Sequence, residues 1–195
     1  MVSQAEGEKL VKYARNVIEN HVRGYEIGEI ENFDEKGGVF VTIHKYPSMH
    51  LRGCIGIPEP LYPLKKAIKE SAISACHDPR FPDLREEELD EIVVEVTILT
   101  PPEIIKGSPS EYKKNIEIGR DGLIAERGFY RGLLLPQVPV EYKWNEEEFL
   151  RNTCIKAGLL PDAWMNENVK IYKFQGEIFA EEEPHGKIKK IELHA

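Results

Sequence analysis

Short strand-like segments separated by tight turns are the feature that most constrains how this chain can fold. Residues 92–99 read Ile-Val-Val-Glu-Val-Thr-Ile-Leu, and in an extended strand successive side chains of such a segment face opposite sides. Similar segments lie at 39–44 and 51–57, with Gly or Pro between them. Neighbouring strands joined by tight turns favour antiparallel pairing. No apolar run approaches the ~18 residues of a membrane-spanning helix, so a membrane protein is not expected.

Helices are predicted between these segments but do not alternate strictly with them. Ser3 and Glu6 form a capping box that begins the first helix, and Gly24 is a typical stop signal. Further helices are predicted at 63–76, 108–115 and 145–158, and further strands at 116–118, 122–126, 129–135, 169–174 and 177–181, the last two as a hairpin around Gln175-Gly176.

This order predicts the α+β class, with a mixed, mostly antiparallel sheet and flanking helices. We expect one domain over residues 5–182, built as two lobes of unequal size packed together. The remaining residues, 183–195, are rich in charge and are expected to form a frayed tail.

Composition excludes several classes of function. The net charge is −8 and no basic run is longer than two residues, so binding to nucleic acid is not expected. The 28 Glu and 17 Lys against 3 Gln are typical of heat-adapted proteins.

The three cysteines form no CxxC pair and no signal peptide is visible, which favours free thiols in a reducing cytoplasm. No ligand spacing for a metal ion is present, and none is expected.

The segment Leu51-Arg52-Gly53-Cys54-Ile55-Gly56 is the most informative candidate site. In a regular strand Arg52, Cys54 and Gly56 share one face, so that a positive charge lies beside the thiol and favours the thiolate. Gly53 and Gly56 would leave the backbone open to a ligand or a partner chain. The structural alternative is that the glycines permit a bulge or tight packing and that Cys54 is a small core residue.

Two other residues could take part in chemistry, and each has a structural alternative. His77 follows a predicted helix end, where it could act as a general base for Cys54 or simply bind helix carbonyls. Glu95 lies in an apolar strand, and it either pairs with Arg52 or Arg80 or lines a pocket; we favour the ion pair.

The remaining candidates are read as structural. Gln137 is expected to satisfy backbone groups in a buried loop. Cys76 and Cys154 have helical core spacing, and Trp144 and Trp164 are expected to pack in the core or between lobes.

With these motifs in view, the chain resembles the AMMECR domain family. Its LRGCIG signature is intact at 51–56, and the resemblance continues at Asp78-Pro79-Arg80-Phe81, at 95–102 and at 132–138. Further matches lie at 149–150, 153–154 and 156–159, so that the resemblance covers about residues 5 to 182.

The resemblance implies a two-lobed α+β fold with no settled activity. No cofactor is expected. Family members are grouped in many prokaryotes with a Memo-type protein and a radical S-adenosylmethionine protein, which are therefore expected partners. The chain lacks the three-cysteine iron–sulfur motif of the latter. Two hypotheses about function remain open. In the first, the protein is a small-molecule or modification enzyme, or its partner subunit, with a cleft around the LRGCIG strand and Cys54. In the second, it is a non-catalytic adaptor that binds a protein partner through the same strand and the loop at 78–81, which we call the DPRF loop. The candidate catalytic residues are Cys54 and His77, and the candidate binding residues are Arg52, Gly53, Gly56, Asp78, Arg80, Glu95 and Gln137.

Overall fold

The structure is a computed structural model that describes residues 1–192, and the chain divides into two compact units. The first unit comprises Met1–Leu99 and Glu177–Glu192, and the second comprises Thr100–Gly176. One long strand, β7 (Lys170–Glu181), contributes its beginning to the second unit and its end to the first.

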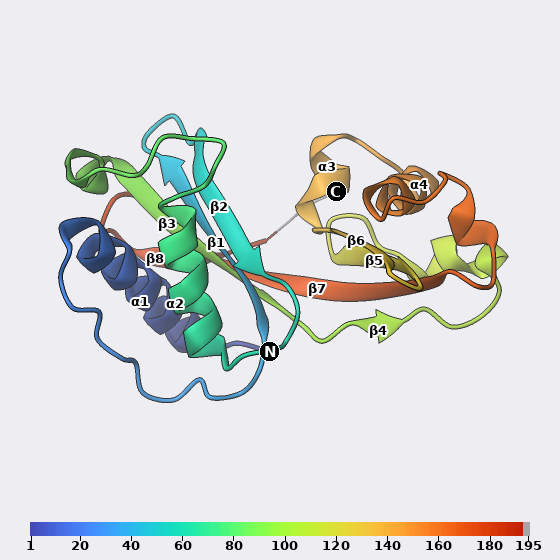
Figure 1. Ribbon diagram of the computed structural model, residues 1–195, viewed down its shortest axis with the longest axis horizontal. Helices are drawn as coiled ribbons and strands as arrows, with labels where there is room; N and C mark the ends of the chain where they lie inside the picture. Colours follow the sequence, from blue (N-terminus) through green and yellow to red (C-terminus); the bar gives the residue numbers. More distant parts are fainter. Residues whose placement is uncertain (193–195) are drawn as a thin grey trace. The chain divides into compact units, whose positions relative to one another are not determined.

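The first unit combines a sheet with two helices (Figure 1). Its sheet has the order β2-β1-β3-β7, with β8 paired to β7, and the β1–β2, β1–β3 and β7–β8 pairs are antiparallel. In chain order its elements are α1 (Gln4–Arg23), β1 (Gly38–Lys45), β2 (Leu51–Ile57), α2 (Leu64–Ala75), a 3₁₀ helix (Glu86–Glu91), β3 (Ile92–Leu99) and β8 (Ile188–Ile191).

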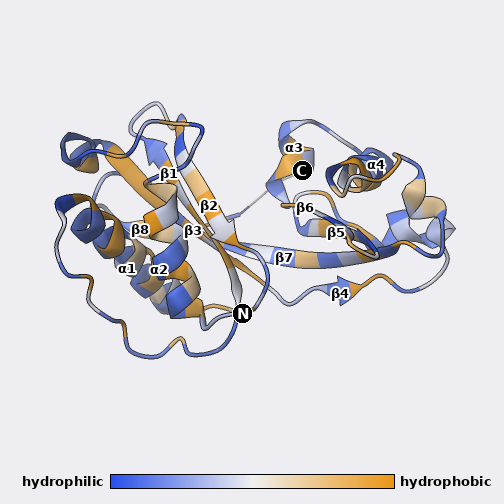
Figure 2. Ribbon diagram, viewed as in Figure 1, coloured by the Kyte–Doolittle hydropathy of each residue, from blue (hydrophilic) through white to orange (hydrophobic). Residues whose placement is uncertain are grey.

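Both helices cover one face of this sheet and enclose the first core. Side chains of α1 and α2 such as Leu10 and Ile68 are fully buried against Val41 of β1 and Val96 of β3. Figure 2 shows hydrophilic and hydrophobic stripes along both helices, as amphipathic packing requires. The other face of the sheet, which carries Thr42, is therefore not covered by these helices.

An ion pair lies inside the first core. The Arg15 guanidinium of α1 donates to both carboxylate oxygens of Glu181, at 2.9 and 2.6 Å, and both side chains are almost fully buried. The same guanidinium donates to the backbone carbonyls of Leu89 and Ile92. The pair thus ties α1 to the end of β7 and to the beginning of β3.

The second unit is a smaller antiparallel sheet with its own core. β5 pairs with both β6 and β7, and β4 pairs with β7. Phe149 and Leu150 of α4 are fully buried in its core, which also contains Trp164. Its elements are β4 (Glu103–Ile104), a 3₁₀ helix (Pro109–Asn115), β5 (Asp121–Arg127), β6 (Tyr130–Leu134), α3 (Gln137–Glu141), α4 (Glu146–Lys156) and a short 3₁₀ helix (Ala163–Met165).

The α+β class is confirmed, and three local predictions are wrong. Gln175-Gly176 does not form a turn, because Gln175 pairs with Asp121 inside the continuous strand β7. Residues 116–118 form no strand. The charged segment after Glu181 is not frayed throughout, because 188–191 pair with 178–181 as β8; residues 193–195 lie outside the described part. No helix within residues 1–192 is long and apolar enough to cross a membrane.

Candidate functional site

A row of three side chains crosses β2, β1 and β3 of the first unit. Thr42 of β1 lies opposite Cys54 of β2 on one side and opposite Glu95 of β3 on the other. Directly opposed residues of antiparallel strands project from the same face of a sheet. Cys54, Thr42 and Glu95 therefore share the face that α1 and α2 leave uncovered, and we call these three residues the cross-strand row.

The Cys54 thiol is half-buried, and its pKa is raised. Burial is the main cause, and the nearby carboxylates of Glu95 and Asp78 add to it. The Thr42 hydroxyl, whose Oγ1 lies 3.2 Å from Sγ, and the Arg80 guanidinium act in the opposite direction but are outweighed. The expectation of a low-pKa thiolate at Cys54 is therefore wrong, and the thiol is protonated at neutral pH.

The DPRF loop holds the free edge of β2 through Asp78 and Arg80. The buried Asp78 carboxylate accepts the backbone N–H of Cys54 at 2.9 Å, and Arg80 Nη2 donates to the Cys54 carbonyl at 3.4 Å. Arg80 also binds Asp78 in bidentate fashion at 3.1 and 2.8 Å, which holds the pKa of that carboxyl far below its usual range. The backbone groups that Cys54 would offer to an added strand are thus occupied.

Gly53 and Gly56 are required by packing inside the first unit. A Cβ at Gly53 would lie 2.3 Å from the carbonyl oxygen of Ala75, and one at Gly56 would lie 2.5 Å from the ring of Phe40. The space beside Gly56 is therefore filled by an aromatic ring. The open backbone expected at Gly53 and Gly56 is therefore not present, and the tight-packing alternative describes both glycines.

Arg52 does not lie beside the thiol, because β2 contains an irregularity at this point. Gly53 opposes Ile43 but Leu51 opposes His44, so Arg52 is an extra residue that reverses the alternation. Its buried guanidinium binds the Glu88 carboxylate at 2.8 and 3.0 Å. The expectation that Arg52 favours a Cys54 thiolate is wrong.

His77 is directed to other partners. Its Nε2 lies 2.7 Å from Nε2 of His21, and its Nδ1 lies 2.9 Å from the Asp83 carboxylate. Both ring nitrogens are therefore engaged away from Cys54, which removes the geometry that a general base for this thiol needs.

Glu95 has neither of the ion-pair partners that we favoured. Arg52 binds Glu88 and Arg80 binds Asp78, and within residues 1–192 the Glu95 carboxylate has no hydrogen bond or salt bridge. Burial alone raises its pKa to about 7. The ion-pair interpretation is wrong, and the carboxyl group lies half-buried on the face of the cross-strand row without an ion-pair partner in the described residues.

The other candidates lie apart from this row. Cys76 and Cys154 are buried, and burial raises their thiol pKa values to about 12 and about 11. Gln137 begins α3 in the second unit, and its Oε1 is buried without a hydrogen-bond partner in the described structure. Trp164 is a core residue of that unit, and Trp144 packs against its core and stacks on Tyr142.

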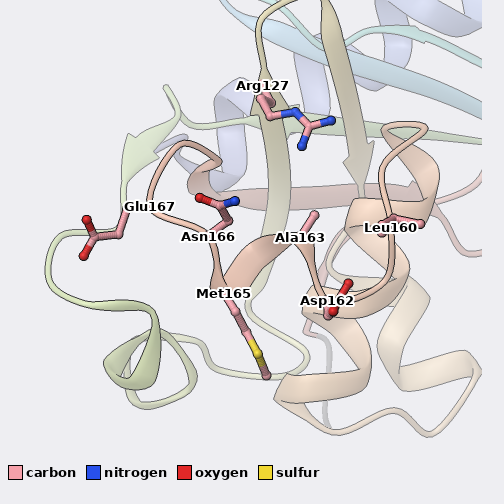
Figure 3. A pocket seen from close by; sticks show the side chains of 7 residues that line it. All are labelled: Arg127, Leu160, Asp162, Ala163, Met165, Asn166 and Glu167. Carbon is pink, nitrogen blue, oxygen red and sulfur yellow. The ribbon is translucent and has the colours of Figure 1, made fainter.

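The second unit also has a surface pocket of about 650 Å³, shown in Figure 3. Arg127, Leu160, Asp162, Ala163 and Asn166 line it together with Met165 and Glu167. In the view of Figure 3 the side chains of Met165 and Glu167 point away from Arg127. Nowhere in residues 1–192 do three or more His, Cys, Asp or Glu side chains gather as metal ligands.

Sequence reasoning missed Thr42, the residue that joins Cys54 to Glu95. Its signal is weak, because a threonine in a strand is ordinary. Only the register of β1 against both neighbours shows that the three side chains form one row.

Comparison with known proteins gives one consistent result. The chain is 58% identical over 193 residues to Protein MJ0810 of Methanocaldococcus jannaschii, with 96% of each chain covered. It is 54% identical to a protein of Thermococcus gammatolerans, with 94% of each covered. The crystal structure of the uncharacterized protein PH0010 from Pyrococcus horikoshii superposes with a TM-score of 0.89 at 52% identity, covering 98% of this chain and 99% of that one. Since the AMMECR1 family model also matches residues 11–179, the chain belongs to the AMMECR1 domain family.

Proposed function

We propose that the protein is an enzyme, or a subunit of one, that carries out proton transfer on a small molecule at the cross-strand row. One observation carries this proposal: Glu95 is a half-buried carboxyl group without any partner in residues 1–192, with its pKa raised to about 7. An unpaired buried carboxylate costs stability. Such a cost is typical of functional sites, where perturbed pKa values gather.

The chemistry follows from the protonation states of the row. A carboxyl group with a pKa of about 7 is present in both forms at neutral pH, so it serves equally as a general base and as a general acid. Cys54 is a protonated thiol there, and with Thr42 it offers hydrogen-bonding groups to a bound molecule. In this proposal Glu95 takes a proton from the substrate, while Cys54 and Thr42 orient it.

Arg80 supplies a nearby positive charge. Its side chain is 57% exposed although it is anchored on the buried Asp78. An anchored, exposed guanidinium is suited to bind an anionic group. The substrate class is therefore a small molecule with one acidic proton and one anionic group.

The adaptor hypothesis is less well supported. A partner that adds a strand to β2 needs the outward N–H and C=O groups of that strand. Asp78 and Arg80 already occupy those groups of Cys54, and Pro58, which follows β2, has no N–H to donate. The edge is thus protected rather than offered.

The two hypotheses differ in what shields Cys54 from alkylation. We would label the folded protein with iodoacetamide at alkaline pH, where a larger fraction of the Cys54 thiol is ionised, in the presence of either the small-molecule or the protein fraction of a thermophilic archaeal extract. The enzyme proposal predicts protection of Cys54 by the small-molecule fraction, and depletion of a metabolite by the native protein but not by Glu95→Gln. Glu70→Gln, which changes an exposed glutamate of α2, is the matched control. Protection by the protein fraction alone, with no metabolite consumed, would favour the adaptor.

The partners implied by family resemblance are a separate proposal. A Memo-type protein and a radical S-adenosylmethionine protein from the same organism should co-elute with this chain in gel filtration. Independent elution of all three at micromolar concentration would contradict it.

A further inference from the structure

His44 of β1 is a further titratable residue on the face of the cross-strand row. Side chains alternate along a strand, so His44 and Thr42, which are two residues apart in β1, project from the same face of the sheet. In the register of β1 against β3, Thr42 lies opposite Glu95 and His44 lies opposite Val93. His44 and Glu95 are therefore diagonal neighbours on this face, with about 7–8 Å between their Cα atoms, a separation that long and aromatic side chains can span.

The imidazole ring of His44 lacks a hydrogen-bond partner within the protein. The side chain is half-buried and its Nδ1 is buried, yet neither ring nitrogen bonds to another residue among residues 1–192. Buried polar atoms in proteins nearly always have a partner, so an atom without one calls for an explanation. Since the Glu95 carboxyl group is unpartnered as well, two titratable side chains with free hydrogen-bonding capacity lie diagonally across one face.

Burial shifts the two groups in opposite directions. It lowers the pKa of His44 and raises the pKa of Glu95 to about 7. At neutral pH the imidazole is therefore uncharged, with one N–H that donates and one bare nitrogen that accepts. Glu95 is present both as the carboxyl group and as the carboxylate, and the Cys54 thiol on the same face is protonated.

These protonation states suit the removal of a proton from the carbon next to a carbonyl group. The Glu95 carboxylate takes that proton, the electron pair of the C–H bond forms a carbon–carbon double bond, and the π pair of the carbonyl moves onto its oxygen. The His44 N–H donates to this oxygen and keeps its proton, because a neutral donor stabilises the charge that develops there. Return of the proton from Glu95 to the same or another atom completes the step without any oxidant or reductant.

We infer that His44 is a catalytic residue of the cross-strand row and that the substrate is a carbonyl compound with a proton on the carbon next to its carbonyl group. A molecule of this class bridges the two side chains, since its C–H bond faces Glu95 and its carbonyl oxygen accepts from His44. The inference rests on the proposed function and narrows it from proton transfer in general to enolisation.

Exchange of carbon-bound protons with solvent deuterium tests the inference. The full chain is incubated in deuterated buffer at neutral pH with the small-molecule fraction of a thermophilic archaeal extract, and separately with pyruvate and with hydroxyacetone. Carbonyl compounds are then trapped with a hydrazine, and mass spectrometry measures their deuterium content. At least one carbonyl compound should take up deuterium faster with the native protein than in buffer alone.

Variants of both residues assign the roles. Glu95→Gln should abolish the exchange, and His44→Phe should slow it about 100-fold, as the loss of one oxyanion donor does. His44→Gln retains an N–H donor and should keep the rate within about tenfold of the native protein. His50→Phe, which changes an exposed histidine of the same unit, is the matched control and should leave the rate unchanged.

Urea midpoints verify that each variant folds, and His44→Leu, which also lacks a donor, replaces His44→Phe if that variant does not. An exchange rate unchanged in His44→Phe, or equally slow in His44→Gln and His44→Phe, would overturn the role of His44 while the proposed function stands. Depletion of a metabolite that depends on Glu95 without exchange into any carbonyl compound would overturn only the substrate class. Exchange that persists in Glu95→Gln, or neither exchange nor depletion with the native protein, would contradict the proposed function as well.

Discussion

Replacing Glu95 by Gln should stabilise the protein at alkaline pH and leave its stability unchanged at pH 4. In the folded state burial raises the pKa of Glu95 from 4.5 to about 7. Because the pKa is higher in the folded state than in the unfolded state, the contribution of Glu95 to the free energy of unfolding is greatest below pH 4.5, where the group is protonated in both states. This contribution is lost as the pH rises through about 7, where the buried group ionises.

The size of the effect follows from the shift. A tenfold change in a protonation equilibrium is worth about 1.4 kcal/mol, so raising the pKa from 4.5 to about 7 costs the folded state up to about 3 kcal/mol at pH 9. Gln has nearly the same shape and never ionises, although its amide also loses water on burial. We therefore expect a gain of about 2 kcal/mol for Glu95→Gln at pH 9.

Guanidinium unfolding at pH 4, 7 and 9 measures this gain as a change in midpoint at constant slope. The exposed Glu70→Gln should change stability by no more than about 0.5 kcal/mol at each pH. A Glu95→Gln variant that is less stable than the native protein at pH 9, or whose effect is the same at pH 4 and pH 9, would refute the reasoning.

Two further predictions concern packing and the buried ion pair. Gly53→Ala places a Cβ 2.3 Å from the backbone oxygen of Ala75 and should destabilise the protein by about 2 kcal/mol. The control Gly28→Ala, whose added Cβ would have no atom within 4 Å, should leave stability unchanged. The midpoints of urea unfolding measure both effects, and equal effects would contradict the packing argument. Arg15→Met removes the ion-pair partner of the buried Glu181 and should lower the free energy of unfolding by about 3–5 kcal/mol at pH 7 in the same assay. A decrease below about 1 kcal/mol would show that the folded protein tolerates Glu181 without this partner.

Short sequence patterns correctly predicted the helix ends and strands that depend on interactions between residues close in sequence. The capping box of Ser3 and Glu6 and the left-handed Gly24 define the ends of α1, and the alternation at 92–99 gives β3. These patterns act over a few residues, so the sequence displays them directly.

Long-range contacts account for the wrong predictions. One extra residue in β2 reverses the alternation and turns Arg52 to Glu88, which no local pattern reveals. Gln175-Gly176 has turn-forming composition, but pairing with the neighbouring strand keeps it extended. Glu95 has no ion-pair partner because Glu88 binds Arg52 and Asp78 binds Arg80, and no local pattern reveals these pairings.

A titration of Glu95 in the folded protein decides whether its carboxyl group can exchange protons at neutral pH. Carbon-detected NMR of the side-chain carboxyl between pH 3 and 10 reports its protonation in the folded protein, with Glu95→Gln identifying the resonance. If burial raises the pKa of this carboxyl group, the midpoint lies at about 7. A midpoint at the ordinary value of about 4.5 would contradict it, because Glu95 would then be a fully ionised carboxylate with no capacity for acid–base chemistry at neutral pH.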